Sequence, residues 1–396
     1  MNRRERLKFF EMLRDDFCSD DGAVRRAAAD YLSAPNPSSL QALSRVVEAP
    51  RQELFRRINT APGGTQTLVG LRSDLLDTDS SCGFFDAIDA DLRHLFRSWF
   101  NRGFLRLERI SWRTSALILE KLIQYESVHE INGWADLRRR LEADRRCFAF
   151  FHPVLVNEPI IFVEVALGNS LASNVEPLLD VNAPVLDPKR ADTAVFYSIN
   201  NCQRGLRNIQ FGNLLIKQVA TDIAAELPNI RNYGTLSPLP QFSHALHDRR
   251  NEQGFTSARL ARLLADYSAE LTTVARKDDA VEAFFCLLQE PLVNRDILRA
   301  PLERLALAYL TRTRRSDGKL YDPVANFHLS NGARLERVNA FGNLRPYGLE
   351  ASVGVTVNYR YVPLEFEENH ERFVRDGRIS MSASLLRVND LIARAW

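Results

Sequence analysis

The chain has 396 residues, of which 45% are hydrophobic and 26% charged, and its 52 Lys and Arg nearly balance 50 Asp and Glu. This is ordinary globular composition, and the length favours two or three domains over one. The formal net charge of +2 provides no global field for nucleic-acid binding, although a local basic patch could still hold a phosphate-bearing ligand. We therefore expect no nucleic-acid partner. No run of about eighteen apolar residues occurs, so we also expect no membrane span.

The two ends and the cysteines indicate the compartment. The first twenty residues mix arginines with acids and fit neither a secretory signal nor a transit peptide, and Ala393–Trp396 is not a Ser-Lys-Leu address. We therefore expect a cytoplasmic protein. The five cysteines lie far apart without a Cys-x-x-Cys pair, which indicates reduced thiols. His244 and His247 share a helical spacing but have no thiol close by, so we expect no metal site.

The first part of the chain, from Met1 to about Arg146, has helical periodicity. Apolar residues recur every three or four positions, as in Leu7, Phe10, Leu13 and Phe17. Breakers occur at Pro35–Ser38, Pro62–Gly64 and Asn132-Gly133. We expect residues 1–146 to form an all-helical N-terminal domain, with a possible role in oligomerisation.

From Cys147 onward, short segments rich in β-branched and aromatic residues predict strands. These segments are Cys147–Phe151, Pro159–Leu167, Thr193–Ile199, Ile230–Leu236, Ala333–Ala340 and Ser352–Tyr361. Helical periodicity returns between Leu214 and Leu227, from about Thr256 to Arg312, and from about Ser382 to Ala395. We expect an α+β protein in which residues 147–396 form a mixed domain with a helical insertion at about residues 245–315.

A polar loop, Asn200–Gly212, precedes the amphipathic helix that begins near Leu214. The first turn of a helix leaves backbone N–H groups unpaired, and its dipole favours an anion. Gly212 would let a pyrophosphate approach the backbone, and Arg204 and Arg207 add positive charge. The segment fits a purely structural turn as well, which is the commoner case.

The loop also resembles a known phosphate-binding turn. Arg207–Gly212 is similar to the Gln/Arg-x-x-Gly-x-Gly/Ala loop of the GNAT-type N-acetyltransferase fold, which binds the CoA pyrophosphate, with Gln210 in place of the first glycine. From this resemblance we expect a set of CoA-binding residues. They are Arg204, Gly205, Leu206, Arg207, Asn208, Gln210, Gly212 and Asn213.

Ser237 is a candidate catalytic hydroxyl within Thr235–Phe242. It stands between a strand end and a Ser-Pro-x-Pro turn, where Pro238 and Pro240 lock the backbone and so give the hydroxyl a fixed direction. The alternative is a serine that merely caps a turn.

His328 is a candidate proton donor within Asp322–Ala333, where it lies between apolar neighbours and close to Asn326, Ser330 and Asn331. Histidine is the side chain whose ordinary pKa suits proton exchange near neutral pH. The alternative is a hydrogen-bonded core histidine with no catalytic role.

Together these segments resemble the malonyl-CoA decarboxylase family. The specific motifs are Ser-Pro-x-Pro and Pro-Val-Ala-Asn-Phe-His-Leu-x-Asn-Gly-Ala, and further similar segments are Phe196–Ile199, Gly212–Lys217, Asn358–Tyr361 and Ser98–Arg106. The resemblance spans roughly residues 70–365. It implies an acetyltransferase-like CoA-binding domain behind a helical domain, catalytic roles for Ser237 and His328, and a homo-oligomer, either dimer or tetramer. The family often has a glutamate at the position of Gln210, which leaves that acid's role in doubt here.

The expected reaction converts malonyl-CoA to acetyl-CoA and carbon dioxide. No metal or organic cofactor is expected, because the thioester carbonyl itself accepts the electrons released by decarboxylation and forms an enolate. Two alternatives stay open. One is a CoA-dependent N-acetyltransferase, and the other is a non-catalytic malonyl-CoA-binding sensor or scaffold.

Overall fold

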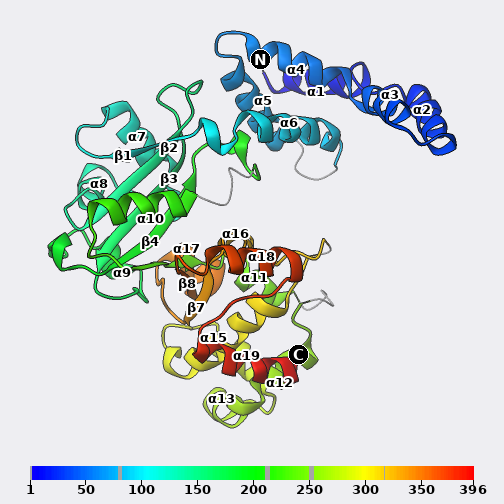
Figure 1. Ribbon diagram of the computed structural model, residues 1–396. Coiled ribbons are helices and arrows are strands. Elements are labelled where there is room, and N and C mark those ends of the chain that lie inside the picture. Colours follow the sequence, from blue (N-terminus) through cyan, green and yellow to red (C-terminus); the bar gives the residue numbers. More distant parts are fainter. Residues whose placement is uncertain (1, 79–82, 210–214, 249–253, 316) are drawn as a thin grey trace.

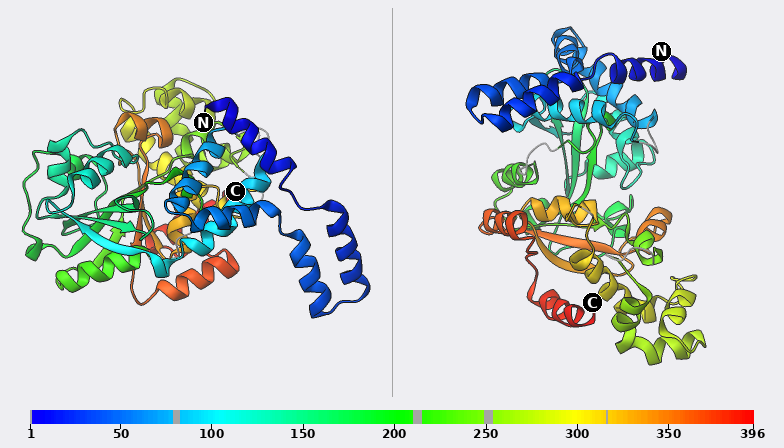
Figure 2. Two further views of the ribbon diagram at one scale, coloured as in Figure 1. Left: turned by 90° about the horizontal axis from the view of Figure 1, so that it is seen from above. Right: turned by 90° about the vertical axis from the view of Figure 1, so that its right-hand side faces the viewer.

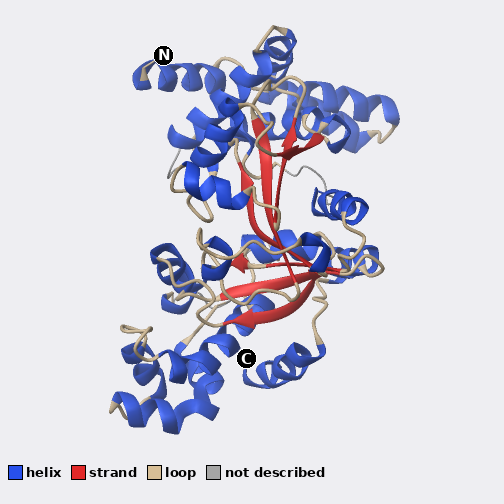
Figure 3. Cartoon of the chain, turned by 90° about the vertical axis from the view of Figure 1, so that its left-hand side faces the viewer, coloured by secondary structure: helices blue, strands red, loops and turns tan. Residues whose placement is uncertain are grey.

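The computed structural model describes residues 2–78, 83–209, 215–248, 254–315 and 317–396. N-terminal helices lie at one end of the molecule, a mixed sheet occupies the middle, and a second group of helices with the C-terminus lies at the other end (Figure 1). One group of strands runs from beneath the N-terminal helices toward the centre of the molecule, and further strands lie crosswise below it, toward the second group of helices (Figure 3). This arrangement confirms the predicted α+β class, with a helical N-terminal region followed by a mixed domain.

The N-terminal helices begin and end at the breakers seen in the sequence. Their bounds are α1 Arg3–Asp15, α2 Asp21–Ser33, α3 Pro37–Val47, α4 Pro50–Thr60, α5 Gly64–Thr78 and α6 Asp86–Trp99. Asn2 caps α1 in a capping box with Glu5, and Pro37 starts α3. Helices α1, α4, α5 and α6 bury apolar residues, whereas α2 and α3 bury none and extend away from the rest (Figure 2).

The sheet has the order β1-β2-β3-β4-β5-β8-β6, with β7 also paired to β8. Its strands are β1 Arg106–Ile110, β2 Arg145–Phe151, β3 Pro159–Gly168, β4 Thr193–Asn201, β5 Asn232–Thr235, β6 Ser237–Pro238, β7 Arg334–Asn339 and β8 Thr356–Tyr361. The β4–β5 pair is parallel and the others are antiparallel. The strands expected from apolar runs are all present.

Strand β1 corrects the expectation that the chain is helical up to Arg146. It pairs with β2 at the edge of the sheet, and only Ile110 in it is buried. An edge strand with polar, exposed positions lacks the apolar run by which the other strands were predicted. Between β1 and β2 lie the helices α7 Ala116–Tyr125 and α8 Trp134–Arg140. A domain boundary at residue 146 stays a prediction.

Strand β5 pairs along its whole length with the beginning of β4. Their register extends from Thr193 opposite Asn232 to Phe196 opposite Thr235, and β4 then continues to Asn201 without β5. The chain after Thr235 turns to pair with β8 instead, where Ser237 lies opposite Val357. Ser237 therefore lies just beyond the point at which β4 and β5 part.

The predicted helical insertion separates β6 from β7. It contains α11 Phe242–His247, α12 Ser257–Leu264, α13 Ser268–Ala275, α14 Ala280–Leu287 and α15 Arg295–Arg312. The remaining helices are the short α9 Glu176–Leu179, then α10 Leu215–Glu226, α16 Pro323–Ser330, α17 Pro346–Ser352, α18 Phe366–Asp376 and α19 Ala383–Ala395. Helix α10 covers one face of the sheet with Leu215, Val219 and Ile223 (Figure 1).

Candidate active site

Two predicted residues from distant parts of the chain meet in the interior. Ser237 Oγ, in β6, lies 3.0 Å from His328 Nε2, on α16. Only 5% of Ser237 and 2% of His328 is exposed. The pair is therefore withdrawn from bulk water. In the protein interior a hydrogen bond between polar groups is stronger than it is in water.

Ser237 is held in place by its own strand and by Thr235. Its hydroxyl donates to Thr235 Oγ1 at 2.9 Å, and the same oxygen accepts the Tyr359 backbone N–H at 3.1 Å. The Asn358 amide donates to the Thr235 carbonyl at 2.6 Å. Residues i and i+2 of an extended chain point to the same side, which explains why Thr235 can orient Ser237.

His328 is positioned by the start of its helix. The Asp322 side chain caps α16 by accepting the Ala325 N–H at 2.8 Å, and Pro323 occupies the first turn. The Tyr309 hydroxyl donates to the other Asp322 oxygen at 3.2 Å. Burial raises the pKa of Asp322 to about 6. This cap sets the direction from which His328 reaches Ser237.

Two tyrosines of β8 surround the imidazole. The Tyr359 ring stacks on it with a centroid distance of 4.6 Å and an interplanar angle of 23°. The Tyr361 hydroxyl lies 2.8 Å from His328 Nδ1. Because alternate residues of a strand share one face, β8 brings both rings to the same side.

Burial decides the protonation state of His328. It lowers the pKa of His328 to about 3, so the imidazole is neutral at pH 7. Burial also raises the pKa of Tyr361 well above its ordinary value, so its hydroxyl keeps its proton. The contacts then assign a consistent chain in which Tyr361 donates to Nδ1, Nε2–H donates to Ser237, and Ser237 donates to Thr235.

Thr235, Tyr359 and Tyr361 were not among the predicted site residues. The sequence contained a signal for each: Thr235 stands two positions before Ser237, and both tyrosines lie within the Asn358–Tyr361 segment. In sequence that segment carries only the family resemblance and no sign of contact with His328.

The predicted CoA-binding turn follows β4 directly. It contains the one-turn helix η3, Arg204–Leu206, and continues through Ile209. Arg204, Arg207 and Asn208 are exposed, whereas Gly205 and Leu206 are buried. Gln210, Gly212 and Asn213 lie outside the described residues.

The buried members of this turn face the protein. A Cβ on Gly205 would lie 1.9 Å from the carbonyl oxygen of Val69 on α5, so a glycine is required there by close packing on a helix. Leu206 is 0% exposed and belongs to the main hydrophobic core. Arg204 forms an ion pair with Asp77, also on α5.

Within the described residues, no group of three or more His, Cys, Asp and Glu side chains is arranged to hold a metal ion. Cys18, Cys147, Cys202 and Cys286 are free thiols. Among the helices that the structure describes, none is long and apolar enough to span a membrane.

The sequence matches two family models in succession. Residues 17–100 match the malonyl-CoA decarboxylase N-terminal domain, and residues 103–395 match the malonyl-CoA decarboxylase C-terminal domain. The mitochondrial malonyl-CoA decarboxylase of Anser anser anser is 33% identical over 406 residues, covering 96% of this chain and 79% of the relative. That of Rattus norvegicus is 32% identical over 403 residues, covering 96% of this chain and 81% of the relative.

Solved structures give the same result. Malonyl-CoA decarboxylase from Rhodopseudomonas palustris superposes with a TM-score of 0.85 at 40% identity, covering 98% of this chain and 91% of that one. The enzyme from Agrobacterium vitis superposes with a TM-score of 0.80 at 42% identity, with the same coverage of 98% and 91%. The chain therefore belongs to the malonyl-CoA decarboxylase family.

Proposed function

We propose that this protein converts malonyl-CoA to acetyl-CoA and carbon dioxide, with Ser237 and His328 as the catalytic pair. The observation that carries this proposal is the buried contact of 3.0 Å between Ser237 Oγ and His328 Nε2 in a chain of this family. Each residue also makes a second hydrogen bond, to Thr235 and to Tyr361 respectively, which orients the Ser237 hydroxyl and sets the tautomer of His328.

The reaction breaks the bond between the carboxylate carbon and the α-carbon of the malonyl group. Carbon dioxide leaves, the electron pair moves into the thioester carbonyl to form an enolate, and the α-carbon then takes one proton. The thioester is itself the electron acceptor, so the proposal includes no metal or organic cofactor. The protein's part is to orient the carboxylate, to donate hydrogen bonds to the enolate oxygen and to supply the proton.

In this mechanism His328 takes up a proton from solvent when the substrate binds. The imidazole is neutral in the free protein because burial lowers the pKa of His328 to about 3. A malonyl carboxylate placed beside it favours the imidazolium, since an opposite charge stabilises the charged form. The Nε2 proton then passes to the α-carbon, directly or through the Ser237 hydroxyl. The proton that forms the imidazolium comes from solvent and enters at Nδ1, where the Tyr361 hydroxyl then turns to accept it. After Nε2 has given up its proton the ring is neutral with its proton on Nδ1, and exchange with solvent restores the resting Nε2–H form. One solvent proton is thus consumed for each carbon dioxide released.

We assign the CoA end of the substrate to the turn after β4. Its exposed residues Arg204, Arg207 and Asn208 would face the pyrophosphate, and Gln210, Gly212 and Asn213 complete the assigned set. Gly205 packs against Val69 of α5 and Leu206 is part of the hydrophobic core, so these two residues fix the turn to the protein. Two features of the sheet support this assignment. Strands β4 and β5 are parallel neighbours, and the turn comes after the end of β4 while Ser237 comes just after the end of β5.

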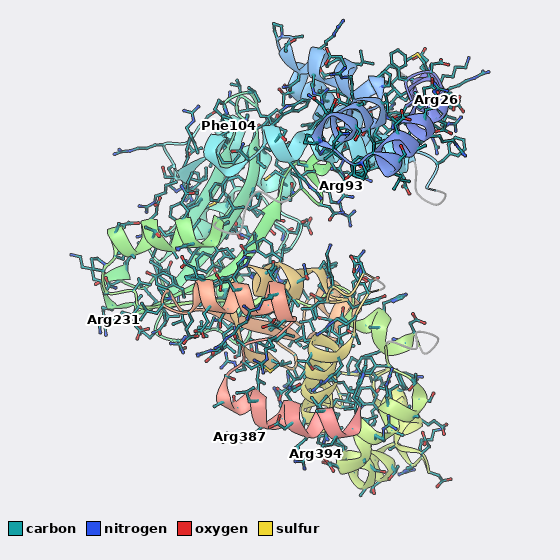
Figure 4. The ribbon with its side chains drawn as sticks, turned by 45° about the vertical axis from the view of Figure 1, so that its right-hand side comes forward. Arg26, Arg93, Phe104, Arg231, Arg387 and Arg394 are labelled. Atoms are coloured by element: carbon teal, nitrogen blue, oxygen red, sulfur yellow. The ribbon has the colours of Figure 1, made fainter. Side chains whose placement is uncertain are left out.

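We further propose a homo-oligomer, either dimer or tetramer, that uses the N-terminal region. Helices α2 and α3 bury no residue of their own, and Leu32 and Val47 on them are 78% and 52% exposed. Figure 4 shows Arg26, on α2, at the end of this region far from the sheet. The cytoplasmic location stays a prediction.

The function is tested by measuring acetyl-CoA and carbon dioxide released from malonyl-CoA by purified protein after EDTA treatment. A Ser237→Ala/His328→Ala double variant is assayed in parallel. Turnover by the wild type and loss of turnover in the double variant are expected. A wild type that binds malonyl-CoA but releases no carbon dioxide would refute the decarboxylase function.

A further inference from the structure

We infer that Arg72, on helix α5 of the N-terminal region, is a positioning residue for the CoA-binding turn, an inference that rests on the proposed function. The guanidinium is 1% exposed, although arginine is seldom fully buried. Its hydrogen-bond partners are groups of the protein on α6 and on the turn after β4.

Arg72 joins the N-terminal helices to the turn after β4. Its Nη1 donates to the Gly205 carbonyl at 2.7 Å and to the Arg207 carbonyl at 2.8 Å. These carbonyls lie 133 and 135 residues away in sequence. Its Nε donates to Asp89 on α6 at 2.7 Å, which compensates the buried charge. One side chain thus fixes the turn against two helices.

Residues of the turn also pack directly on helix α5. Gly205 packs so closely on α5 that any Cβ there would lie 1.9 Å from the Val69 carbonyl oxygen. Leu206 is fully buried beside it. The two side chains that follow, Arg207 and Asn208, point outward and are exposed. Anchoring the Arg207 carbonyl therefore limits where these exposed groups can be.

The physical consequence is pre-organisation of the turn. A ligand that binds an already ordered turn does not have to order it on binding, so its affinity is higher. Without Arg72 the Gly205 and Arg207 carbonyls lose a charged donor in a buried site, and the turn is free to shift. The lost affinity concerns only the part of the substrate held by this turn. The chemistry at Ser237 and His328 is not changed.

The test compares two substrates, malonyl-CoA and malonyl-pantetheine, which lacks the pyrophosphate and the adenosine 3′-phosphate. For Arg72→Met, KM for malonyl-CoA should rise at least about tenfold with kcat changed little, because the turn loses the two hydrogen bonds from Arg72 that pre-organise it and only uniform binding is weakened. The kcat/KM for malonyl-pantetheine should stay within about twofold of wild type. Arg51→Met, on α4, is the matched control, because Arg51 is also buried and pairs with α6 through Asp91, while its other hydrogen bonds go to the Leu13 and Phe17 carbonyls. Its KM for both substrates should stay near the wild-type value.

Gly205→Ala disturbs the packing of the turn on α5 without changing Arg72. It tests whether the position of the turn controls malonyl-CoA binding if Arg72→Met does not fold. It should also raise KM selectively for malonyl-CoA. Equal losses for both substrates, or no loss for either, would overturn the inference. A wild type that uses the two substrates equally well would overturn it too, while leaving the decarboxylase activity standing. A wild type that decarboxylates neither refutes the proposed function itself.

Discussion

The Tyr361 hydroxyl and the Nδ1 atom of His328 lie 2.8 Å apart, on the side of the imidazole away from Ser237. A donor at Nδ1 leaves the proton of the neutral ring on Nε2, the nitrogen that faces Ser237 at 3.0 Å. Tyr361 therefore sets which ring nitrogen can serve the reaction.

Tyr361→Phe should lower kcat by about one to two orders of magnitude, because the neutral imidazole loses the contact that holds its tautomer and orientation. It should also cost about 1–3 kcal/mol of stability, since Nδ1 is left buried without a donor. The measurement is steady-state kinetics together with chemical denaturation.

Tyr359→Phe is the matched control for Tyr361→Phe. The Tyr359 ring stacks on His328, but its buried hydroxyl has no hydrogen-bond partner among the described residues. Removal of that hydroxyl should leave kcat near the wild-type value. Equal losses in the two variants would mean that the ring environment, and not the Nδ1 contact, is what matters.

Thr235→Val should reduce kcat by about tenfold, comparable to the loss of one hydrogen bond at the reacting group. The substitution keeps the shape but removes the oxygen that accepts both the Ser237 hydroxyl and the Tyr359 N–H. Thr235→Ser keeps that oxygen and should retain most of the activity. If Val and Ser variants have the same kcat, Thr235 does not orient Ser237.

Asp322→Ala should destabilise the protein by about 1–2 kcal/mol, because α16 loses the cap that accepts the Ala325 N–H. The kcat should fall as well, since His328 stands on the same short helix. Asp322→Asn keeps a capping oxygen and should be milder on both measures. Thermal denaturation and kinetics of the two variants provide the comparison.

The pH dependence of stability should contain a contribution from His328. Its pKa is about 3 in the folded protein against an ordinary value of 6.5, so between these values the unfolded chain binds the additional proton. Stability from this residue is therefore fully present above pH 6.5 and is lost as the pH falls, by about 1.4 kcal/mol per pH unit.

This contribution is isolated by comparing denaturation of wild type and His328→Asn at several pH values between 7.5 and 5 (about the range of the ordinary histidine titration). The difference in their free energies of unfolding should shrink or change sign as the pH falls. Parallel curves would contradict a neutral, buried His328.

The sequence predicted most of the fold because apolar patterns are local. β2 and β3 contain the apolar runs Cys147–Phe151 and Pro159–Val163, and the breakers at Pro37 and Gly64 begin helices. β1 was missed because an edge strand with one buried residue has no such run. β6 is two residues long and exists only because Ser237 pairs with Val357, far along the chain.

Only the part of the site that has local sequence motifs could be predicted. Ser237 and His328 each carry a local motif, but their contact spans 91 residues and depends on the whole sheet. Arg72 could not be distinguished by pattern, because in sequence it is one of 52 basic residues and stands on a helix like many others. Its proposed role depends on hydrogen bonds to two backbone carbonyl groups, which no side-chain pattern reveals.

A double-mutant cycle on Ser237 and His328 tests the central claim most directly. If the two residues act as one catalytic unit, Ser237→Ala and His328→Asn should each lower kcat by about 10²–10⁴-fold. The double variant should then be no worse than the poorer single variant by more than about threefold. If the two effects multiply instead, or if His328→Asn keeps more than about a tenth of wild-type turnover, the two residues do not form the catalytic pair.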